Sequence, residues 1–207
     1  MPLYFIGLGL NNEKDITVNG LEAVKKSDLV YLENYTSVLN CTKEQLEKFY
    51  NKKIILANRK LVESDGNEIL ENAKTKNAAF LVAGDSLAAT THIDLFLRAK
   101  KEGIKCHVIH NASIINAIGV TGLQLYKFGK TTSIPLENEN IESPYDVLKG
   151  NLSLGLHTLL LLDLNPTGIM YAIPSLNFLL KHHTEIQHSH FQEESRLFYR
   201  IYKVAIQ

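Results

Sequence analysis

The sequence predicts an α/β protein with a first lobe built on a mostly parallel sheet, followed by an incomplete second α/β lobe. Short apolar runs alternate with amphipathic stretches, which is the order of strands and helices in parallel sheets. Glycine-containing or polar segments follow several of these runs, as ligand-binding loops follow parallel strands. The composition, 45% hydrophobic and 21% charged, is that of an ordinary globular protein, and the length of 207 residues lies between one domain and two.

The strands of the first lobe are predicted from short apolar runs. They cover residues 4–8, 29–32, 53–56, 78–83 and 105–109. Because helical patterns separate these runs, we expect neighbouring strands of the sheet to be mostly parallel.

The helices of the first lobe are predicted from apolar residues at helical spacing. Thr42 and Gln45 form a capping-box pattern that marks the start of one helix, and Gly103 ends another. The predicted helices cover residues 16–26, 42–50, 67–73, 92–101 and 113–118.

The second lobe is predicted to begin after residue 130, which gives lobes 1–130 and 131–207. Pro135 and the Asn/Glu cluster that follows it predict a surface loop. Around this loop we expect a strand at 131–136, a helix at 144–152, a strand buried on both faces at 157–162, a helix at 173–181, and a strand or helix at 196–207.

Charge and cysteine content exclude several classes of protein. Lys plus Arg is 22 and Asp plus Glu is 22, so the chain lacks the basic excess of a protein held to nucleic acid by general charge. Cys41 and Cys106 are the only cysteines, and they form neither a disulfide framework nor a Cys-x-x-Cys zinc motif. We therefore expect a reducing compartment, the cytoplasm, and no direct binding to nucleic acid.

No membrane or targeting segment is predicted. The apolar first strand lacks the basic start and the small-residue cleavage site of a signal peptide. The other apolar runs are far too short to cross a membrane.

Several histidines crowd a short polar stretch near the end of the chain. They could bind a metal ion or form an exposed polar turn. We favour the turn, so no metal site is predicted. The histidines are His182, His183, His188 and His190.

Four segments at predicted strand ends are candidates for ligand binding. They are residues 7–10, 84–92, 110–114 and 161–163. The glycines of the first would let a backbone approach a ligand closely, although Asn12 breaks the dinucleotide fingerprint. From the residues alone, we infer a ligand-binding α/β protein with its site at these strand ends.

Each of these segments has a second interpretation. The glycines at 7–10 could simply form a tight turn packed on its own sheet. Asp85 could pair with a ligand ammonium or accept ribose hydroxyls, while Thr90 or Thr91 could simply cap the next helix. Asn111 or Ser113 could likewise act only as a helix cap. The segment at 161–163 could be an ordinary buried strand with a polar exit.

Taken together, several segments resemble the diphthine synthase family. The resemblance runs almost continuously from residue 2 to about residue 165, and it is far more specific than any single glycine motif. The segments are LYFIGLGL at 3–10, KDITV at 14–18, YTS at 35–37, ATTH at 89–92, VIHNASI at 108–114, GLQLYKFG at 122–129 and GLHTLLLLD at 155–163.

The resemblance implies a class III, tetrapyrrole-methylase-like methyltransferase. Such proteins hold S-adenosylmethionine between two α/β lobes and usually form homodimers. The implied reaction is repeated methylation of a modified histidine on translation elongation factor 2 during diphthamide synthesis. The His-Asn-Ala and Leu-Gln-Leu-Tyr runs resemble the eukaryotic branch, in which the carboxylate is also esterified to diphthine methyl ester.

The same resemblance implies the cofactor-contacting residues. The loop at 35–37 is the implied approach for the acceptor. Methyl transfer from a sulfonium needs alignment and a dry cleft more than an acid–base pair, so no catalytic residue is assigned. The implied cofactor contacts are Leu10, Asp85, Ala88, Ser113, Ile114 and Leu162.

The chain departs from the family in two places. Ser86 stands where the family usually has proline, which predicts a looser turn and weaker cofactor binding. After Lys181 we find no counterpart of the segments that complete the cofactor cleft, and residues from about 182 to 207 do not resemble the family.

Three functions therefore remain open at this point. The first is an active methyltransferase of the diphthine synthase type. The second is a catalytically defective, binding-only relative that lacks part of the cofactor cleft. The third, a methylase of the same class acting on tetrapyrroles, is disfavoured by the runs at 35–37 and 110–114.

Overall fold

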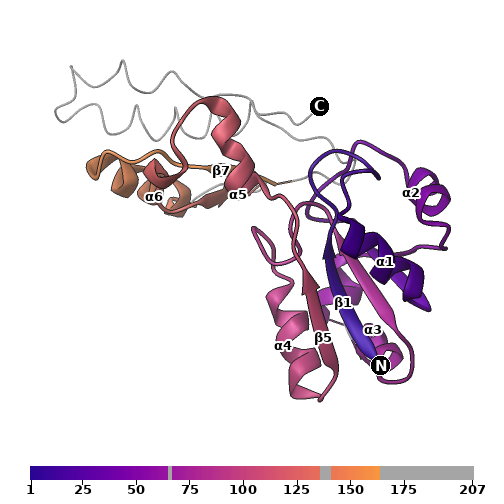
Figure 1. Cartoon of the computed structure of the whole chain (residues 1–207). Coiled ribbons are helices and arrows are strands. Elements are labelled where there is room, and N and C mark those ends of the chain that lie inside the picture. The colour runs from indigo at the N-terminus through magenta and orange to yellow at the C-terminus, as the bar shows by residue number, and fades with distance from the viewer. Residues whose placement is uncertain (65–66, 136–140, 164–207) are drawn as a thin grey trace. The chain divides into compact units, whose positions relative to one another are not determined.

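The computed structural model describes residues 1–64, 67–135 and 141–163 (Figure 1). The chain divides into two compact units, the first holding Met1–Ala117 and the second beginning at Ile118. The division therefore places residues 118–130 in the second unit, ahead of the predicted boundary after residue 130.

The first unit contains a five-stranded parallel sheet in the order β3-β2-β4-β1-β5. Every neighbouring pair in it is parallel, which confirms the predicted fold class. In this order β4 lies between β2 and β1, and β1 lies between β4 and β5. The parallel strands β4, β1 and β5 therefore end side by side. The strands are β1 (Pro2–Gly7), β2 (Leu29–Glu33), β3 (Ile55–Ala57), β4 (Ala78–Val82) and β5 (Lys105–Ile109).

The helices of the first unit begin at local signals in the sequence. The predicted capping box is confirmed, because the Thr42 side chain accepts from the Gln45 amide and the Gln45 side chain accepts from the Thr42 amide. Thr17 caps the first helix in the same way, accepting from the Gly20 amide. The helices are α1 (Val18–Lys26), α2 (Lys43–Tyr50), α3 (Asn67–Thr75), α4 (Ile93–Lys101) and α5 (Ile114–Ala117).

The sheet is covered on both faces, as Figure 1 shows. Successive residues of a strand point to opposite faces, so Phe80 joins one core cluster and Leu81 the other. Phe80 packs in the cluster that includes residues of α3 and α4, and Leu81 in the one that includes residues of α1 and α2. Both side chains are 0% exposed, and each such burial contributes about 1.5–3 kcal/mol.

The described part of the second unit contains a small parallel sheet and one α-helix. Its elements are the 3-10 turns η2 (Ile118–Thr121) and η3 (Leu125–Lys127), the strands β6 (Thr132–Ile134) and β7 (Leu160–Leu162), and α6 (Ser143–Ser153). Asn151 of α6 connects the segments that lead into the two strands, because its side-chain amide donates to the Lys130 carbonyl and the Thr158 hydroxyl. The predicted strand at 157–162 is shorter than expected, and the residues of β7 are half-buried rather than buried on both faces.

Some predictions fall outside the described residues. These are the helix at 173–181, the strand or helix at 196–207, the histidines at 182–190 and the dissimilar tail.

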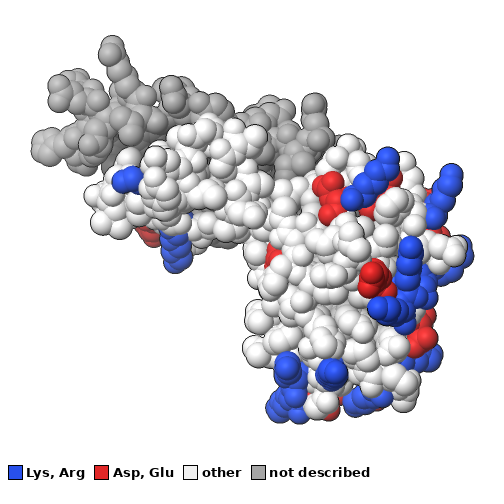
Figure 2. Space-filling view, viewed as in Figure 1, with Lys and Arg blue, Asp and Glu red and all other residues white. Residues whose placement is uncertain are grey.

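Within the described ranges, none of the helices has the length and apolar character needed to cross a membrane. In the same part of the chain, no group of three or more His, Cys, Asp and Glu residues is placed to hold a metal ion. The face of the first unit seen in Figure 2 carries acidic side chains among the basic ones.

Candidate functional site

The loops after β1 and β4 are joined through their glycine backbones. The Gly9 amide donates to the Gly84 carbonyl at 3.1 Å, and the Gly84 amide donates to the Gly9 carbonyl at 2.6 Å. Both residues have a positive φ, +78° for Gly9 and +76° for Gly84. Glycine adopts this conformation without steric cost, so the two motifs predicted separately from the sequence form one backbone pair.

Gly7, the last residue of β1, has no room for a side chain. A β-carbon on Gly7 would lie 2.6 Å from the Gly84 carbonyl oxygen and 2.9 Å from Cβ of Asn111. The ends of β1, β4 and β5 can therefore meet only if residue 7 has no side chain.

Asp85 follows β4 and joins it to the end of β5. It is 6% exposed, and its carboxylate accepts from the Leu87 amide at 2.9 Å and from the Asn111 amide at 3.0 Å. His110 Nδ1 lies 2.8 Å from the same oxygen that Asn111 contacts, and it donates because a carboxylate can only accept. Burial by itself would raise the pKa of Asp85, but these hydrogen bonds outweigh burial and lower it.

Asn111 connects three segments, a role that the sequence did not reveal. Its side-chain amide donates to the Gly7 carbonyl at 3.0 Å and to the Asp15 carbonyl at 2.9 Å. The Asn111 side chain therefore holds the glycine loop in place and does not cap α5. Ser113 caps that helix instead. The Ser113 hydroxyl accepts from the Ile115 amide at 3.2 Å.

The cofactor residues implied by resemblance fall at these loops. The Cα of Gly84 faces a small space, because a β-carbon added there would have Cδ2 of Leu10 at 3.8 Å and Cα of Ser113 at 4.0 Å. Ala88 lies in the turn after Asp85, and its amide donates to the Asp85 carbonyl at 3.4 Å.

The other two implied residues complete the set. Ile114 is the first residue of α5 and is half-buried. Leu162 ends β7 in the second unit. The cofactor role of each of these residues is a prediction.

The loop after β4 also contains a buried hydroxyl, that of Ser86. Ser86 is 0% exposed, and its Oγ has no partner among the residues that the structure describes. Thr90 and Thr91, which could have capped α4, instead contact His92 and Glu63, and the N-cap is His92 without a side-chain cap.

Replacing Ser86 by alanine should leave stability unchanged or raise the free energy of unfolding by up to about 1 kcal/mol. The substitution removes a buried polar group that gains no hydrogen bond in return. Ser27→Ala is the matched control, because Ser27 is equally buried but its hydroxyl donates to the Ala23 carbonyl at 2.8 Å. Denaturant unfolding should show a loss of about 1 kcal/mol for Ser27→Ala. An equal loss for Ser86→Ala would contradict the assignment.

Comparison with known proteins places this arrangement in a family. The model of the tetrapyrrole (corrin/porphyrin) methylases matches residues 2–182. This chain belongs to the tetrapyrrole methylase family. Among its relatives are the diphthine methyl ester synthases of Schizosaccharomyces pombe, 56% identical over 163 residues, and Homo sapiens, 55% identical over 164 residues. The resemblance to diphthine synthases found in the sequence is thereby confirmed.

A solved structure supports the same conclusion for the fold. A crystal structure of diphthine synthase matches with a TM-score of 0.77 and 43% sequence identity, covering 80% of this chain and 66% of that one. The two curated relatives are each matched over 78% of this chain and 58% of their own length. The chain thus spans somewhat more than half the length of these curated relatives.

Sequence reasoning missed two contributors to the site. Asn111 lay in a motif that was singled out, but its main contact is with Gly7, 104 residues earlier. His92 was expected only to begin a helix, yet its ring is 0% exposed and contacts Tyr35. In both cases the signal in the sequence was a polar side chain near a strand end. Such a signal does not indicate which distant residue the side chain contacts.

Proposed function

We propose that this chain acts as an S-adenosylmethionine-dependent methyltransferase on the modified histidine of translation elongation factor 2, in diphthamide biosynthesis. The observation that carries the proposal is the convergence of the loops after β1, β4 and β5 in a chain that is 56% identical to a diphthine methyl ester synthase. A cytoplasmic location, a homodimer and a two-lobe division near residue 130 belong to the same proposal.

The residues at these loops fit the proposed cofactor. Gly84 presents bare backbone, and Leu10 and Ser113 border the space that a side chain on Gly84 would fill. We propose that Leu10, Ala88, Ser113, Ile114 and Leu162 contact the cofactor. Asp85 already accepts three hydrogen bonds from its own chain, so it acts mainly by fixing the loops.

Methyl transfer requires the site to align the reacting groups and to exclude water. A bound S-adenosylmethionine supplies a methyl group on a positively charged sulfur. The residues around Gly84 would orient this group, and their apolar side chains would keep water away from it. A carboxylate acceptor is already ionised at neutral pH, so its methylation needs no general base from the protein.

Calorimetry with S-adenosylmethionine, followed by transfer of a labelled methyl group to elongation factor 2, tests the proposal. We expect saturable binding and labelled acceptor. Binding without transfer would instead support a binding-only relative. The absence of heat at millimolar cofactor, with a folded protein, would overturn the proposal.

A pair of variants makes the binding test site-specific. Leu10→Arg puts a bulky side chain beside Gly84 and should weaken cofactor binding more than tenfold. Leu97→Arg is the matched control, because Leu97 lies on α4 and is 58% exposed. The control should bind the cofactor as the unchanged chain does.

A further inference from the structure

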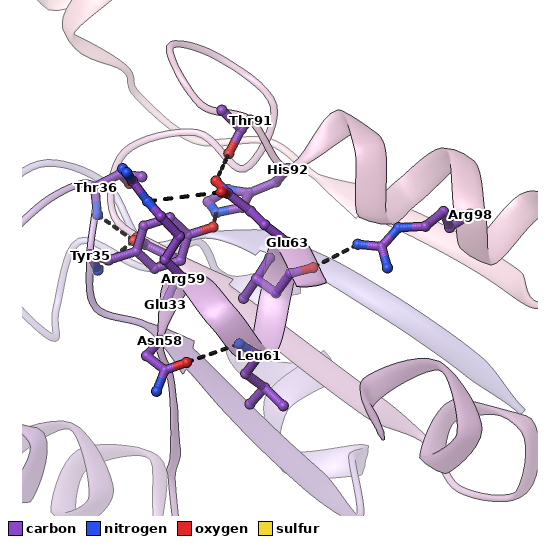
Figure 3. A network of polar contacts seen from close by, with 11 residues as sticks. Glu33, Tyr35, Thr36, Asn58, Arg59, Leu61, Glu63, Thr91, His92 and Arg98 are labelled. Atoms are coloured by element: carbon purple, nitrogen blue, oxygen red, sulfur yellow. Dashed lines mark hydrogen bonds and ion pairs between the residues drawn. The ribbon is translucent and has the colours of Figure 1, made fainter. Parts of the chain in front are cut away.

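A second group of polar residues lies along the same edge of the sheet. The order β3-β2-β4-β1-β5 puts the loops after β3 and β2 beside the loop after β4, on the side away from β5. Arg59 follows β3, Tyr35 follows β2 and His92 ends the loop after β4; Figure 3 shows the three together. The loop after β4 therefore contributes Asp85 to the candidate cofactor site and His92 to this second group.

Tyr35 is held in one position by His92. The Tyr35 hydroxyl lies 3.3 Å from Nε2 of His92, and the Thr90 hydroxyl lies 2.6 Å from Nδ1. Burial lowers the pKa of His92 to about 4 and raises the pKa of Tyr35 to about 12, so the imidazole is neutral and the phenol keeps its proton. The phenol can then donate to Nε2 while Nδ1–H donates to Thr90, which gives both ring nitrogens a partner.

Arg59 immediately precedes a turn that is itself fixed. The turn is the π-helical segment η1 (Lys60–Ser64), a rare geometry that often marks functional sites. The Asn58 side chain accepts from the Leu61 amide at 2.9 Å, and Arg98 donates to the Val62 carbonyl at 2.6 Å. The backbone around Arg59 is thus held by Asn58, just before the turn, and by Arg98 of α4.

The guanidinium of Arg59 is held on one side and open on the other. Its central carbon lies 5.4 Å from the centre of the Tyr35 ring, and its Nε lies 3.9 Å from Glu63 Oε2. Its two terminal nitrogens make no hydrogen bond or ion pair with any residue in the described ranges, and the side chain is 64% exposed. Arg98, in contrast, is engaged by Asp94 and the Val62 carbonyl.

A buried carboxyl fixes the backbone of the loop that holds Tyr35, and the charge of Arg59 acts on its pKa in the opposite direction to burial. Glu33 is 2% exposed, and its Oε1 accepts from the Tyr35 amide at 2.6 Å and from the Thr36 amide. Its Oε2 has no hydrogen-bond partner in the described part of the chain, and burial raises its pKa. A carboxyl that is costly to bury fixes this loop, as is common where a loop serves a binding site.

We propose that Arg59 binds the carboxylate of the acceptor side chain and so presents it to the neighbouring cofactor site. This inference rests on the proposed function. A planar guanidinium whose terminal nitrogens are free matches a carboxylate with two parallel hydrogen bonds. The cation–π contact with Tyr35 and the ion pair with Glu63 set the direction of the guanidinium in advance.

The same contact distinguishes acceptor from product. On methylation, a carboxylate oxygen forms the new bond to the methyl carbon while the sulfur–carbon bond breaks and its electron pair stays on sulfur. No proton moves, and the carboxylate loses its negative charge. The ester therefore loses the ion pair with Arg59, which favours release of the product.

Binding of elongation factor 2 to the full chain, without cofactor, tests the proposal. The acceptor is supplied in two forms, with the free carboxylate and as the methyl ester, and affinities are measured by titration. The unchanged chain should prefer the carboxylate form about tenfold, the effect of one charge-assisted contact. Arg59→Gln should reduce that preference to within twofold, and Arg59→Lys, which keeps the charge without the fork, should give an intermediate value.

Lys26→Gln is the control for net charge. Lys26 ends α1, at the opposite edge of the sheet, and its side chain is 70% exposed. This variant should keep the full preference. An unchanged preference in Arg59→Gln would overturn the assignment of Arg59 alone, and so would an unchanged chain that binds both forms equally. A folded chain that binds neither form would overturn the proposed function as well.

Discussion

Replacing Gly7 by alanine is expected to destabilise the first unit by about 3 kcal/mol. The new β-carbon would lie 2.6 Å from the Gly84 carbonyl oxygen, a backbone atom that cannot turn aside as a flexible side chain would. Relief requires β1 and β4 to separate where they meet Asn111, so the cost should reach the upper end of that for overpacked cores. Denaturant unfolding measures the change in free energy.

Gly150→Ala is the control for this substitution. Gly150 lies within α6, and a β-carbon there would have no atom within 4 Å. Alanine should stabilise the helix by up to about 1 kcal/mol, because it loses less backbone entropy on folding than glycine. If Gly7→Ala unfolds at the same denaturant concentration as the unchanged chain, the close approach of the two strands is not as described.

Replacing Asp85 by asparagine should lower the free energy of unfolding by about 2 kcal/mol and weaken cofactor binding at least tenfold. The asparagine NH₂ would face either the donors of Asn111 and His110 or the amide of Leu87, so one donor always meets another. The loss is that of a hydrogen bond to a charged acceptor. Unfolding and calorimetry give the two values.

The effect of Asp85→Asn should also depend on pH. The pKa of Asp85 is lowered from 3.8 in the folded chain. Its contribution to stability is therefore present above that value and is lost as the pH falls through the folded-state pKa. The difference between the two chains should shrink in acid below about pH 4. Asp94→Asn, an exposed aspartate on α4, should change stability by less than about 0.5 kcal/mol at any of these pH values.

The local parts of this structure could be predicted from short stretches of sequence. The capping box of Thr42 and Gln45 needs only four residues, and it starts α2 where predicted. The apolar run at 78–83 predicts β4 because any buried strand in a parallel sheet must be apolar. The positive φ of Gly9 and Gly84 is likewise a property of glycine itself.

The contacts between distant residues could not be predicted in this way. Nothing near Asn111 indicates that its side chain reaches Gly7 rather than the helix that follows. Tyr35 and His92 are 57 residues apart, and each taken alone has an ordinary local interpretation. The π-helical geometry of η1 depends in part on Arg98, which reaches it from α4.

The sequence by itself determined the α/β class, most of the elements and the strand ends where a ligand site should lie. It also determined the family, through segments that agree in order along the chain. Only the tertiary structure decided that β4 lies between β2 and β1, and so which loops meet. The physical reason is that helix and strand signals act over a few residues. Strand order and the pairing of Asp85 with Asn111, or of Tyr35 with His92, depend on the packing of the whole sheet.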